Sequence, residues 1–446
     1  MNSSLLLAYY GDDFTGSTDA LEFLSRAGVK TALFIETPTP EQLASYPDLR
    51  AMGVAGMTRS IPPASMEPIL RSAFTELRKL GSRHVHYKVC STFDSSPTMG
   101  SIGKAIDVGQ EVFHKNFIPL LVAAPSLGRY CVFGNLFARM GIGSDGAIFR
   151  LDRHPSMSKH PVTPADESDL RLHLARQTTK KVGLLDILQL VKNQEDIQNT
   201  ITALLQDGSD IILFDALYDD QLTPIGELID SYGHPHNPLF LVGSSGIEMA
   251  LGKYWESIGA LQPVTPWPDP GKATPLLVLS GSCSPITAKQ IAWATANGFA
   301  EIIIDAQQID AGAWLLPHMT DYNRKAIEFI SEGRSVIIHT GGTSAAQNKL
   351  FSSQKLGTAL GLIAREVVGQ CSAIKRVVVA GGDTSSYAAR AMGIEAVEMI
   401  APLVAGAPLC KATAPGSPID GIDVNFKGGQ VGAENYFGIL LEGHVF

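Results

Sequence analysis

Short apolar runs alternate with amphipathic stretches along almost the whole chain, and no other feature constrains the fold as strongly. This alternation is typical of βαβ units, in which buried parallel strands are connected by helices. It predicts an α/β fold with largely parallel sheets. The predicted strands are residues 5–10, 51–57, 84–89, 119–124, 211–214, 239–243, 276–280, 301–305, 335–340 and 376–380, and the first predicted helix is residues 17–27.

A proline-rich segment interrupts this pattern at residues 261–275, where five of fifteen residues are proline. Proline is excluded from helix interiors and central strands, so this segment forms neither. The length of 446 residues accommodates two or three domains. We therefore expect two α/β domains, residues 1–260 and 276–446, joined by the linker 261–275 and facing an interdomain cleft. A second proline-containing stretch, residues 150–164, predicts a long loop inside the first domain, with a further domain boundary as the alternative.

Charge and cysteine content limit the possible partners and compartments. The chain has 44 acidic and 35 basic residues, a formal net charge of −9, which excludes a generic nucleic-acid or membrane-surface binder. Its five cysteines form no CxxC pair, which argues against a disulfide framework or a thiolate metal site and favours a reducing cytosol. The first apolar run stops at Gly11 and is too short for a signal peptide or a membrane span, so we expect a cytoplasmic protein.

Three turns rich in glycine, serine and threonine follow predicted strands of the second domain: Ser280–Ser284, Thr340–Ser344 and Gly381–Ser385. Such turns lie at the carboxyl edge of a parallel sheet, where glycine lets the backbone approach a phosphate and helix N–H groups bind it. Pro285 fits the first position of a helix capped by Ser284. The alternative is that these are ordinary αβ turns. The predicted nucleotide contacts in these turns are Ser280, Ser282, Gly381, Gly382, Asp383 and Thr384.

A further glycine turn lies late in the chain, where Lys427 precedes Gly428 and Gly429. We include both glycines among the predicted nucleotide contacts, with Lys427 as a candidate phosphate ligand. The alternative is a plain hairpin turn with a solvated lysine. The P-loop pattern and the protein-kinase motifs are missing from the sequence. A GxGxxG pattern at 141–146 follows residues 135–140, which predict a helix rather than a strand, so we reject a Rossmann site there.

Asp12 and Asp13 come directly after the first predicted strand. One of them is suited to capping a helix or contacting Mg²⁺, and the other to acting as a general base that removes a proton from a substrate hydroxyl. We favour Asp13 as the base, with Asp12 close behind. The alternative is an aspartate-rich turn in which one side chain caps the helix.

Basic residues lie at the ends of the next two strands. Arg59 and Lys88 can supply the fork and the point charge that bind a small carboxylate, although singly each is more often a surface charge. Val89, Cys90 and Ser91 complete the predicted substrate contacts, with Cys90 as a neutral wall residue. His154 and His160 lie in the long loop, where a pocket role and a structural role are both open. With no matching third ligand, they predict no metal site.

These motifs together resemble the four-carbon acid sugar kinases. The matching segments are DDFTGSTDA at 12–20, KVCST at 88–92, PSLGR at 125–129, HPVTP at 160–164, LSGSCSPITAKQI at 279–291 and GGDTSSYAARAMGI at 381–394. The resemblance implies an ATP-dependent kinase of a small sugar acid such as threonate, erythronate or 3-oxo-tetronate. It places the acid sugar in the N-terminal domain and ATP in the C-terminal domain. By resemblance, the acid sugar is contacted by Asp12 or Asp13, Arg59 and Lys88–Ser91, and the nucleotide by Ser282, Gly381–Thr384 and Gly428.

Two departures from the family pattern affect the substrate side. Gly11 stands where the family commonly has alanine, and residues 129–160 are longer or more divergent. They leave the acid sugar open, including branched relatives such as 3-oxo-isoapionate. We expect phosphoryl transfer with Mg²⁺ bridging the triphosphate oxygens, and a homodimer is compatible with the sequence. The alternatives are an NAD-dependent sugar-acid oxidoreductase and a non-catalytic nucleotide or sugar-acid sensor.

Overall fold

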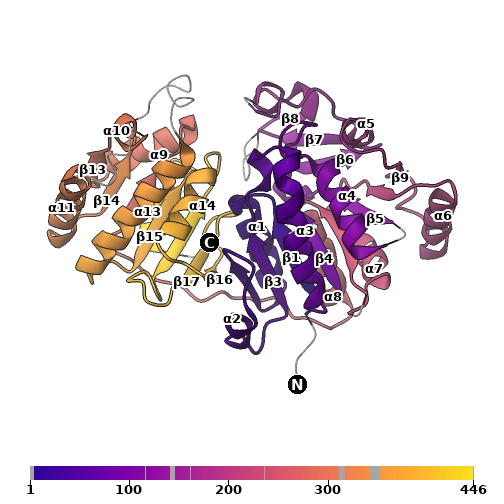
Figure 1. Ribbon diagram of the computed structural model, residues 1–446, viewed down its shortest axis with the longest axis horizontal. Coiled ribbons are helices and arrows are strands. Elements are labelled where there is room, and N and C mark those ends of the chain that lie inside the picture. The colour runs from indigo at the N-terminus through magenta and orange to yellow at the C-terminus, as the bar shows by residue number, and fades with distance from the viewer. Residues whose placement is uncertain are drawn as a thin grey trace. The chain divides into compact units, whose positions relative to one another are not determined.

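The computed structural model describes residues 5–115, 117–140, 146–160, 162–235, 237–310, 317–341 and 352–444. It divides into two compact units (Figure 1). Unit 1 comprises Met1–Ala32 and Glu36–Val264, and unit 2 comprises Leu33–Ile35 and Thr265–Phe446. The change at Val264 falls inside the proline-rich segment, whereas unit 1 runs without a break through residues 150–164. The cleft expected between two domains stays a prediction.

Unit 1 is built on a parallel sheet in the order β3-β1-β4-β11-β5-β10-β9. Its strands are β1 (Leu7–Gly11), β3 (Ala51–Ala55), β4 (His84–Lys88), β5 (Ile118–Leu121), β9 (Val182–Leu185), β10 (Ile211–Phe214) and β11 (Leu239–Gly243). Its helices are α1 (Phe14–Arg26), α2 (Pro40–Ala44), α3 (Pro63–Lys79), α4 (Ile102–Phe113), α5 (Leu170–Ala175), α6 (Gln194–Gln206), α7 (Leu222–Ser231) and α8 (Gly246–Ser257).

The strands of this sheet are buried, which explains why continuous apolar runs in the sequence predicted their positions. Every residue of β1, β3, β4 and β11 is buried, as expected for parallel strands covered on both faces. The predicted strands of this unit are confirmed to within three residues at each end. The helices form two packed groups, α3 with α4, and α1 with α8 and α7. Phe240 of β11 packs against the first group, with its ring centroid 5.0 Å from Phe113 of α4 and 5.1 Å from Phe74 of α3.

A second, three-stranded antiparallel sheet in unit 1 was not predicted. It consists of β6 (Arg129–Val132), β7 (Asn135–Arg139) and β8 (Ile148–Arg150). The helix predicted over residues 135–140 is therefore wrong, because alternate side chains of this segment face the interior with the period of a strand. The GxGxxG pattern lies largely outside the described residues, but the next described element is the strand β8, so the context of a dinucleotide site is still absent there.

The buried carboxylate of Asp215 anchors this small sheet to the end of β10. Its oxygens accept hydrogen bonds from the backbone N–H groups of Phe133 (2.6 Å) and Gly134 (3.0 Å) in the turn between β6 and β7, and of Ile187 (3.1 Å). The backbones of Cys131 and Ala216 also pair. The small sheet is thus attached near the carboxyl edge of the main sheet.

Unit 2 has parallel strands in the order β13-β14-β12-β15-β18, continued by the antiparallel strands β17 and β16. Its strands are β12 (Leu277–Ser280), β13 (Ala300–Ile303), β14 (Val336–His339), β15 (Arg376–Ala380), β16 (Ala396–Ala401), β17 (Leu409–Thr413) and β18 (Asp423–Lys427). Its helices are α9 (Pro285–Ala296), α10 (Ala306–Asp310), α11 (Pro317–Ser331), α13 (Ser353–Gln370), α14 (Gly382–Ala391) and α15 (Tyr436–Glu442).

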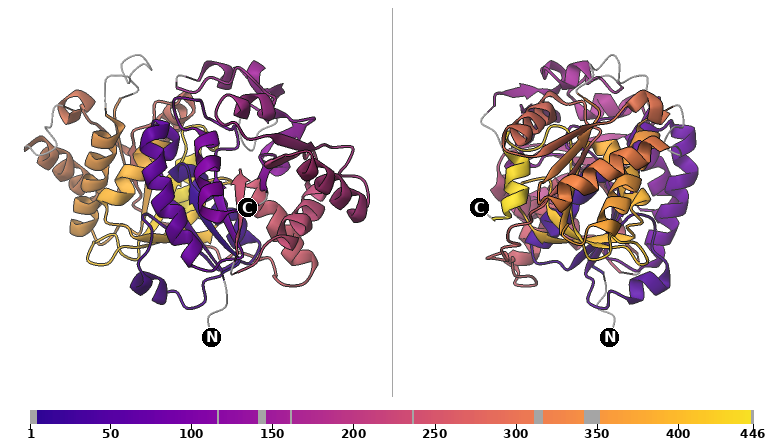
Figure 2. Two further views of the ribbon diagram at one scale, coloured as in Figure 1. Left: turned by 45° about the vertical axis from the view of Figure 1, so that its right-hand side comes forward. Right: turned by 90° about the vertical axis from the view of Figure 1, so that its left-hand side faces the viewer.

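The edge of this sheet is completed by residues from the beginning of the chain. The strand β2 (Thr31–Phe34) contributes Leu33 and Phe34, which pair antiparallel with Val397 and Ala396 of β16. The helices α13 and α14 pack together, and α15, the yellow C-terminal helix in the right-hand view of Figure 2, packs on α9. Within the described residues, no helix has the length and apolar character needed to span a bilayer.

Candidate active site

Three neighbouring strands of unit 1 end together and bring the predicted substrate residues close. In the register of the sheet, Gly11 at the end of β1 pairs with Ala55 of β3 and with Lys88 of β4. Beyond the strands, the backbone N–H of Asp12 donates to the carbonyl of Lys88 (2.8 Å), and the N–H of Arg59 donates to the carbonyl of Asp12 (3.0 Å). The carboxyl edge of this sheet therefore holds Asp12, Asp13, Arg59 and Lys88 in one cluster.

Both carboxylate oxygens of Asp13 are already engaged. Asp13 is the N-cap of α1, where Oδ1 accepts a hydrogen bond from the backbone N–H of Gly16 (2.8 Å). Oδ2 forms an ion pair with Nη1 of Arg59 (2.8 Å). A Cβ at Gly16 would lie 2.6 Å from Oδ1 of Asp13, so only glycine fits under this cap. Asp13 thus fixes the start of the helix and the position of Arg59.

Asp12 has a different environment. Its side chain is buried, with 2% of the residue exposed, and among the described residues Oδ1 has no hydrogen-bond partner. Burial and the neighbouring charge of Asp13 raise its pKa to about 7, against the opposing charges of Arg59 and Lys88. A carboxyl group with such a pKa and a free oxygen is suited to accept a proton near neutral pH. The sequence favoured Asp13 as the base, and the geometry favours Asp12.

Lys88 and Cys90 lie in the wall of this cluster. The Lys88 side chain is almost fully buried, and its Nζ donates to the carbonyl of Val89 (3.0 Å). Burial raises the pKa of the Cys90 thiol to about 12, which favours the neutral thiol, and its place in a substrate wall stays a prediction. Ser91 follows directly and is also buried. The segment Lys88–Ser91 therefore presents one cation among neutral groups.

Two residues of this cluster escaped the sequence analysis. Asp19 of α1 accepts a hydrogen bond from Oγ of Ser245 (2.6 Å), and its pKa is raised by burial against the opposing charge of Lys88. Arg129, at the start of β6, is 6% exposed and lies within electrostatic reach of Cys90 and Asp19. Asp19 belongs to the motif DDFTGSTDA and Arg129 to the motif PSLGR. Their burial depends on tertiary packing, which the sequence does not display.

The two loop histidines have structural partners. Nδ1 of His154 accepts hydrogen bonds from the N–H groups of Ser156 (3.2 Å) and Met157 (3.3 Å), and Nδ1 of His160 accepts one from the N–H of Thr163 (3.1 Å). Both therefore cap turns of their own loop. No group of three or more histidine, cysteine, aspartate or glutamate side chains suited to a metal ion occurs in the part of the chain that is described.

Three glycine turns meet at the corresponding edge of unit 2. Ser280 of β12 pairs with Ala380 of β15, and Ala380 pairs with Lys427 of β18. The N–H of Gly281 donates to the carbonyl of Ala380 (3.1 Å), and the N–H of Gly381 to that of Lys427 (2.9 Å). The predicted nucleotide residues from three distant stretches of sequence therefore lie side by side. Of the fourth predicted turn, residues 342–344 lie outside the described residues.

The close approach of these turns requires glycine. A Cβ at Gly281 would lie 2.4 Å from Oγ1 of Thr384, and one at Gly429 would lie 3.0 Å from Oγ of Ser282. Gly381 has a φ of 123°, a backbone conformation that other residues rarely adopt. It is the N-cap of α14, where no side chain accepts from the first N–H groups of the helix, and such free N–H groups suit an anion.

The serine turn before α9 is held by its own hydroxyls. Oγ of Ser280 accepts a hydrogen bond from the N–H of Ser282 (3.4 Å), and Oγ of Ser282 donates to Oγ1 of Thr287 (3.0 Å). Ser284 is the N-cap of α9 and Pro285 is its first residue, as predicted. Ser280 is 1% exposed and therefore supports the turn from inside.

Lys427 is buried rather than solvated. It is the last residue of β18, between β15 and β17, and has 0% exposure. Its Nζ donates to Oγ1 of Thr287 (3.1 Å) and lies 5.3 Å from the ring centre of Tyr436. Burial lowers its pKa to about 7. The alternative of a hairpin turn with a solvated lysine is therefore wrong.

The unusual glycine before the two aspartates has a steric reason. A Cβ at Gly11 would lie 1.9 Å from Oγ of Ser17, which donates to the carbonyl of Asp13 (2.7 Å). We expect G11A to lower the free energy of unfolding by about 1–3 kcal/mol, as overpacking does, and S17A to restore part of this loss in the double variant. Urea unfolding of the parent, G11A, S17A and the double variant measures these free energies of unfolding. A G11A variant as stable as the parent would contradict this account.

Comparison with known proteins places these two units among described families. Residues 7–251 match a family model described as a sugar-binding N-terminal domain, and residues 277–437 match one described as a nucleotide-binding C-terminal domain. A 3-oxo-isoapionate kinase from Paraburkholderia graminis is 41% identical, over 99% of this chain and 95% of its own. A 3-oxo-tetronate kinase from Pseudomonas savastanoi pv. phaseolicola is 29% identical, over 99% and 98%.

Solved structures share the fold. A Salmonella typhimurium LT2 protein superposes with a TM-score of 0.75 at 24% identity, covering 97% of this chain and 98% of the other. A Haemophilus influenzae protein superposes with a TM-score of 0.71 at 22% identity and the same coverage. At these identities the likeness is one of architecture only.

Proposed function

Because this chain belongs to the four-carbon acid sugar kinase family, its reaction is ATP-dependent phosphorylation of a small acid sugar, and we propose that the substrate is a 3-oxo acid, with 3-oxo-isoapionate preferred. The observation that carries this choice is the 41% identity to a 3-oxo-isoapionate kinase, against 29% for a 3-oxo-tetronate kinase. The kinase relatives support neither of the two alternatives, an oxidoreductase or a sensor. The cytoplasmic location and the homodimer stay predictions.

In the proposed mechanism, unit 1 binds the acid sugar and Asp12 is the general base. Its free Oδ1 accepts the proton of the substrate hydroxyl as that oxygen bonds to the γ-phosphorus of ATP, and the bond from this phosphorus to the oxygen of ADP breaks. Arg59, held by Asp13, and Lys88 supply positive charge beside the reacting hydroxyl. Asp13 is therefore a positioning residue in this proposal.

Unit 2 is proposed to bind ATP through its glycine turns. The N–H groups at the start of α14 and the turns containing Ser282 and Gly428–Gly429 would receive the phosphates, with Lys427 beneath them. Asp383, exposed in the first turn of α14, fits the single carboxylate that Mg²⁺ needs when phosphate oxygens and water supply its other ligands. Bound there, Mg²⁺ would neutralise phosphate charge.

A coupled ADP-release assay with a panel of sugar acids tests the proposed substrate. We expect kcat/KM to be highest for 3-oxo-isoapionate, lower for 3-oxo-tetronate, and lowest for threonate and erythronate, which lack the 3-oxo group. The panel also contains a neutral sugar as a control for ATP hydrolysis. A higher kcat/KM for threonate or erythronate than for either 3-oxo acid would contradict the proposal.

A further inference from the structure

Arg129 belongs to a segment that the proposed mechanism leaves without a role. It follows the turn Pro125–Leu127 and Gly128, whose φ of 68° reverses the chain. Its backbone is bonded in both directions to Ala124, with distances of 3.0 and 3.2 Å. This turn comes after the carboxyl end of β5, a strand of the same parallel sheet as β1 and β4. Arg129 is therefore fixed near the sheet edge that carries Asp12 and Lys88.

The guanidinium of Arg129 is held by one of its three nitrogens only. Nη1 donates to the backbone carbonyls of Leu127 (3.2 Å), Gly128 (3.3 Å) and Arg139 (3.2 Å). Within the described residues, Nη2 has no hydrogen-bond partner, and neither has Nε, which is completely buried. The three carbonyls fix the plane of the group and therefore the direction of Nη2. Because Nε is covered by protein, Nη2 is the donor left for a ligand.

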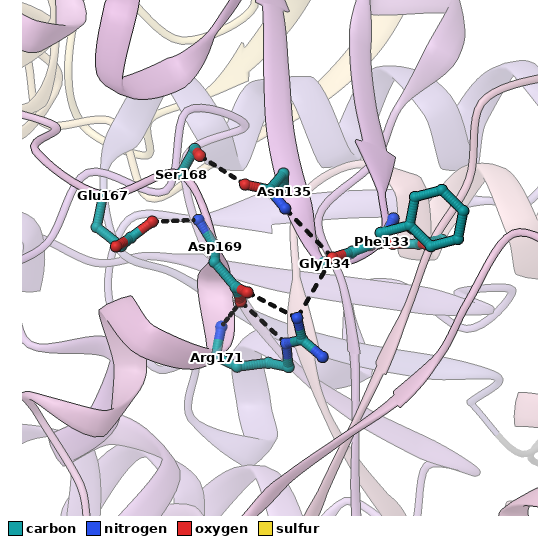
Figure 3. A network of polar contacts seen from close by, with 8 residues as sticks. Phe133, Gly134, Asn135, Glu167, Ser168, Asp169 and Arg171 are labelled. Carbon is teal, nitrogen blue, oxygen red and sulfur yellow. Dashed lines mark hydrogen bonds and ion pairs between the residues drawn. The ribbon is translucent and has the colours of Figure 1, made fainter.

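Arginine side chains bind carboxylates elsewhere in this chain. In Arg171, Nε and Nη2 donate to the two oxygens of Asp169 at 3.0 and 2.6 Å (Figure 3). In Arg150, Nε and Nη2 donate to those of Asp152 at 2.7 and 2.5 Å. Such bidentate pairing is the strongest geometry that arginine offers to a carboxylate. Arg129 differs from both, because its buried Nε leaves only Nη2 for a carboxylate. Within the described residues, no aspartate or glutamate is bonded to it.

The surroundings of Arg129 point to an anionic ligand. Burial lowers its pKa, and the neighbouring groups that oppose this change include Cys90, Asp19 and Asp94. None of the three lies within ion-pair distance of Arg129, and Asp19 is bonded to Ser245 instead. A buried guanidinium with unpaired N–H groups is costly, and a ligand carboxylate would offset that cost.

We propose that Nη2 of Arg129 binds the carboxylate of the acid sugar and so selects acids over neutral sugars. This inference rests on the proposed function. It changes the expectation that Arg59 and Lys88 fix the carboxylate, because Arg59 is already paired with Asp13 at 2.8 Å. Those two cations are then left to act at the reacting hydroxyl. The substrate would thus lie with its acid end at the end of β5 and its hydroxyl toward Asp12.

Steady-state kinetics of R129M and R129K test the proposal, with R139M as a matched control. Arg139 lies in the same small sheet and donates to Gly146 and Tyr130. We expect R129M to lower kcat/KM for the acid sugar by about 10- to 100-fold, as loss of hydrogen bonds to a charged group does, with KM for ATP unchanged. For the primary amide of the same sugar acid, R129M and the parent should have equal kcat/KM. R129K should fall between the parent and R129M, and R139M should match the parent.

Each other outcome has a definite meaning. Equal losses for acid and amide would show a structural role, and a raised KM for ATP alone would show a phosphate ligand; both overturn the proposal. If R129M does not fold, R129K provides the test. If R129K has the melting temperature of the parent and an unchanged kcat/KM for the acid sugar, the proposal is also overturned. Failure of the parent enzyme to release ADP with any acid sugar would instead refute the proposed function.

Discussion

Replacing Asp12 with asparagine is expected to lower kcat by about 10²- to 10⁴-fold, the contribution typical of a positioned general base. Asparagine has nearly the same shape but cannot accept the hydroxyl proton. Oδ1 of Asp12 is buried and has no partner among the described residues, so the substitution breaks no hydrogen bond of that oxygen. The Kd for ATP should remain unchanged, because the proposed nucleotide residues belong to unit 2. Rapid-quench turnover and calorimetric titration of ATP measure the two quantities.

Asp13→Asn is the matched control. Asparagine still caps α1 and loses only the charge that pairs with Arg59, so its effect on kcat should be much smaller than that of D12N. In the parent, kcat/KM should rise as the pH increases through about 7, because the pKa of Asp12 is raised to about 7 and the base must be ionised. In D12N, kcat/KM should no longer rise with pH through this range. A larger loss of kcat in D13N than in D12N would instead identify Asp13 as the base.

Ionisation of Asp12 lowers the stability of the fold while it raises activity. The raised pKa means that the folded chain keeps a proton on Asp12 between the ordinary value of 3.8 and about 7, whereas the unfolded chain does not. Asp12 therefore makes the fold less stable as the pH rises through this window. Activity and this contribution to stability change oppositely with pH, as is common where a buried acid does chemistry.

Lys427→Met is expected to raise KM for ATP by about 10- to 100-fold, as loss of a charged hydrogen-bond donor does. It should not destabilise the free protein. The lowered pKa of about 7, against an ordinary 10.5, means that the unfolded chain binds the proton more tightly. Stability in the parent therefore increases with pH between these values, and the buried charge is unfavourable below about 7. The melting temperature of K427M at pH 6 should equal or exceed that of the parent.

Lys411→Met is the control for Lys427. Lys411 lies on the neighbouring strand β17, is about half exposed, and pairs with Asp423. Its removal should leave KM for ATP unchanged. Saturation kinetics at fixed acid-sugar concentration measure both variants. An unchanged KM for ATP in K427M would remove Lys427 from the nucleotide site, and a lower melting temperature at pH 6 would contradict the pKa argument.

Much of this fold follows from local sequence. Parallel strands covered on both faces are continuous apolar runs, so the strands carrying Asp12, Lys88 and Gly381 could be located from the sequence. The carboxyl ends of parallel strands share one edge of a sheet. Within each unit, the turns that follow the predicted strands therefore lie together at that edge. The small sheet containing Arg129 was missed because its strands are short and contain polar or charged residues, so they form no continuous apolar run.

The roles within the site depend on tertiary contacts that no local pattern displays. Asp12 and Asp13 are adjacent in sequence, yet only one is free, because α1 and Arg59 both engage the other. Lys427 beside two glycines resembles a turn residue, and its burial depends on Thr287 and Tyr436, which are distant in sequence or on another element. Arg129 is a candidate because its Nη2 has no partner among the described residues, and no local pattern displays that.

The most direct test is competition between two acids for the same enzyme. Equimolar 3-oxo-isoapionate and 3-oxo-tetronate are incubated with ATP, Mg²⁺ and the purified full chain, and the products are followed by mass spectrometry. The account predicts that phosphorylated 3-oxo-isoapionate forms first, with an equal amount of ADP, and that D12N forms neither phosphorylated acid in the same time. Formation of ADP without a phosphorylated sugar acid, or equal turnover by D12N, would contradict it.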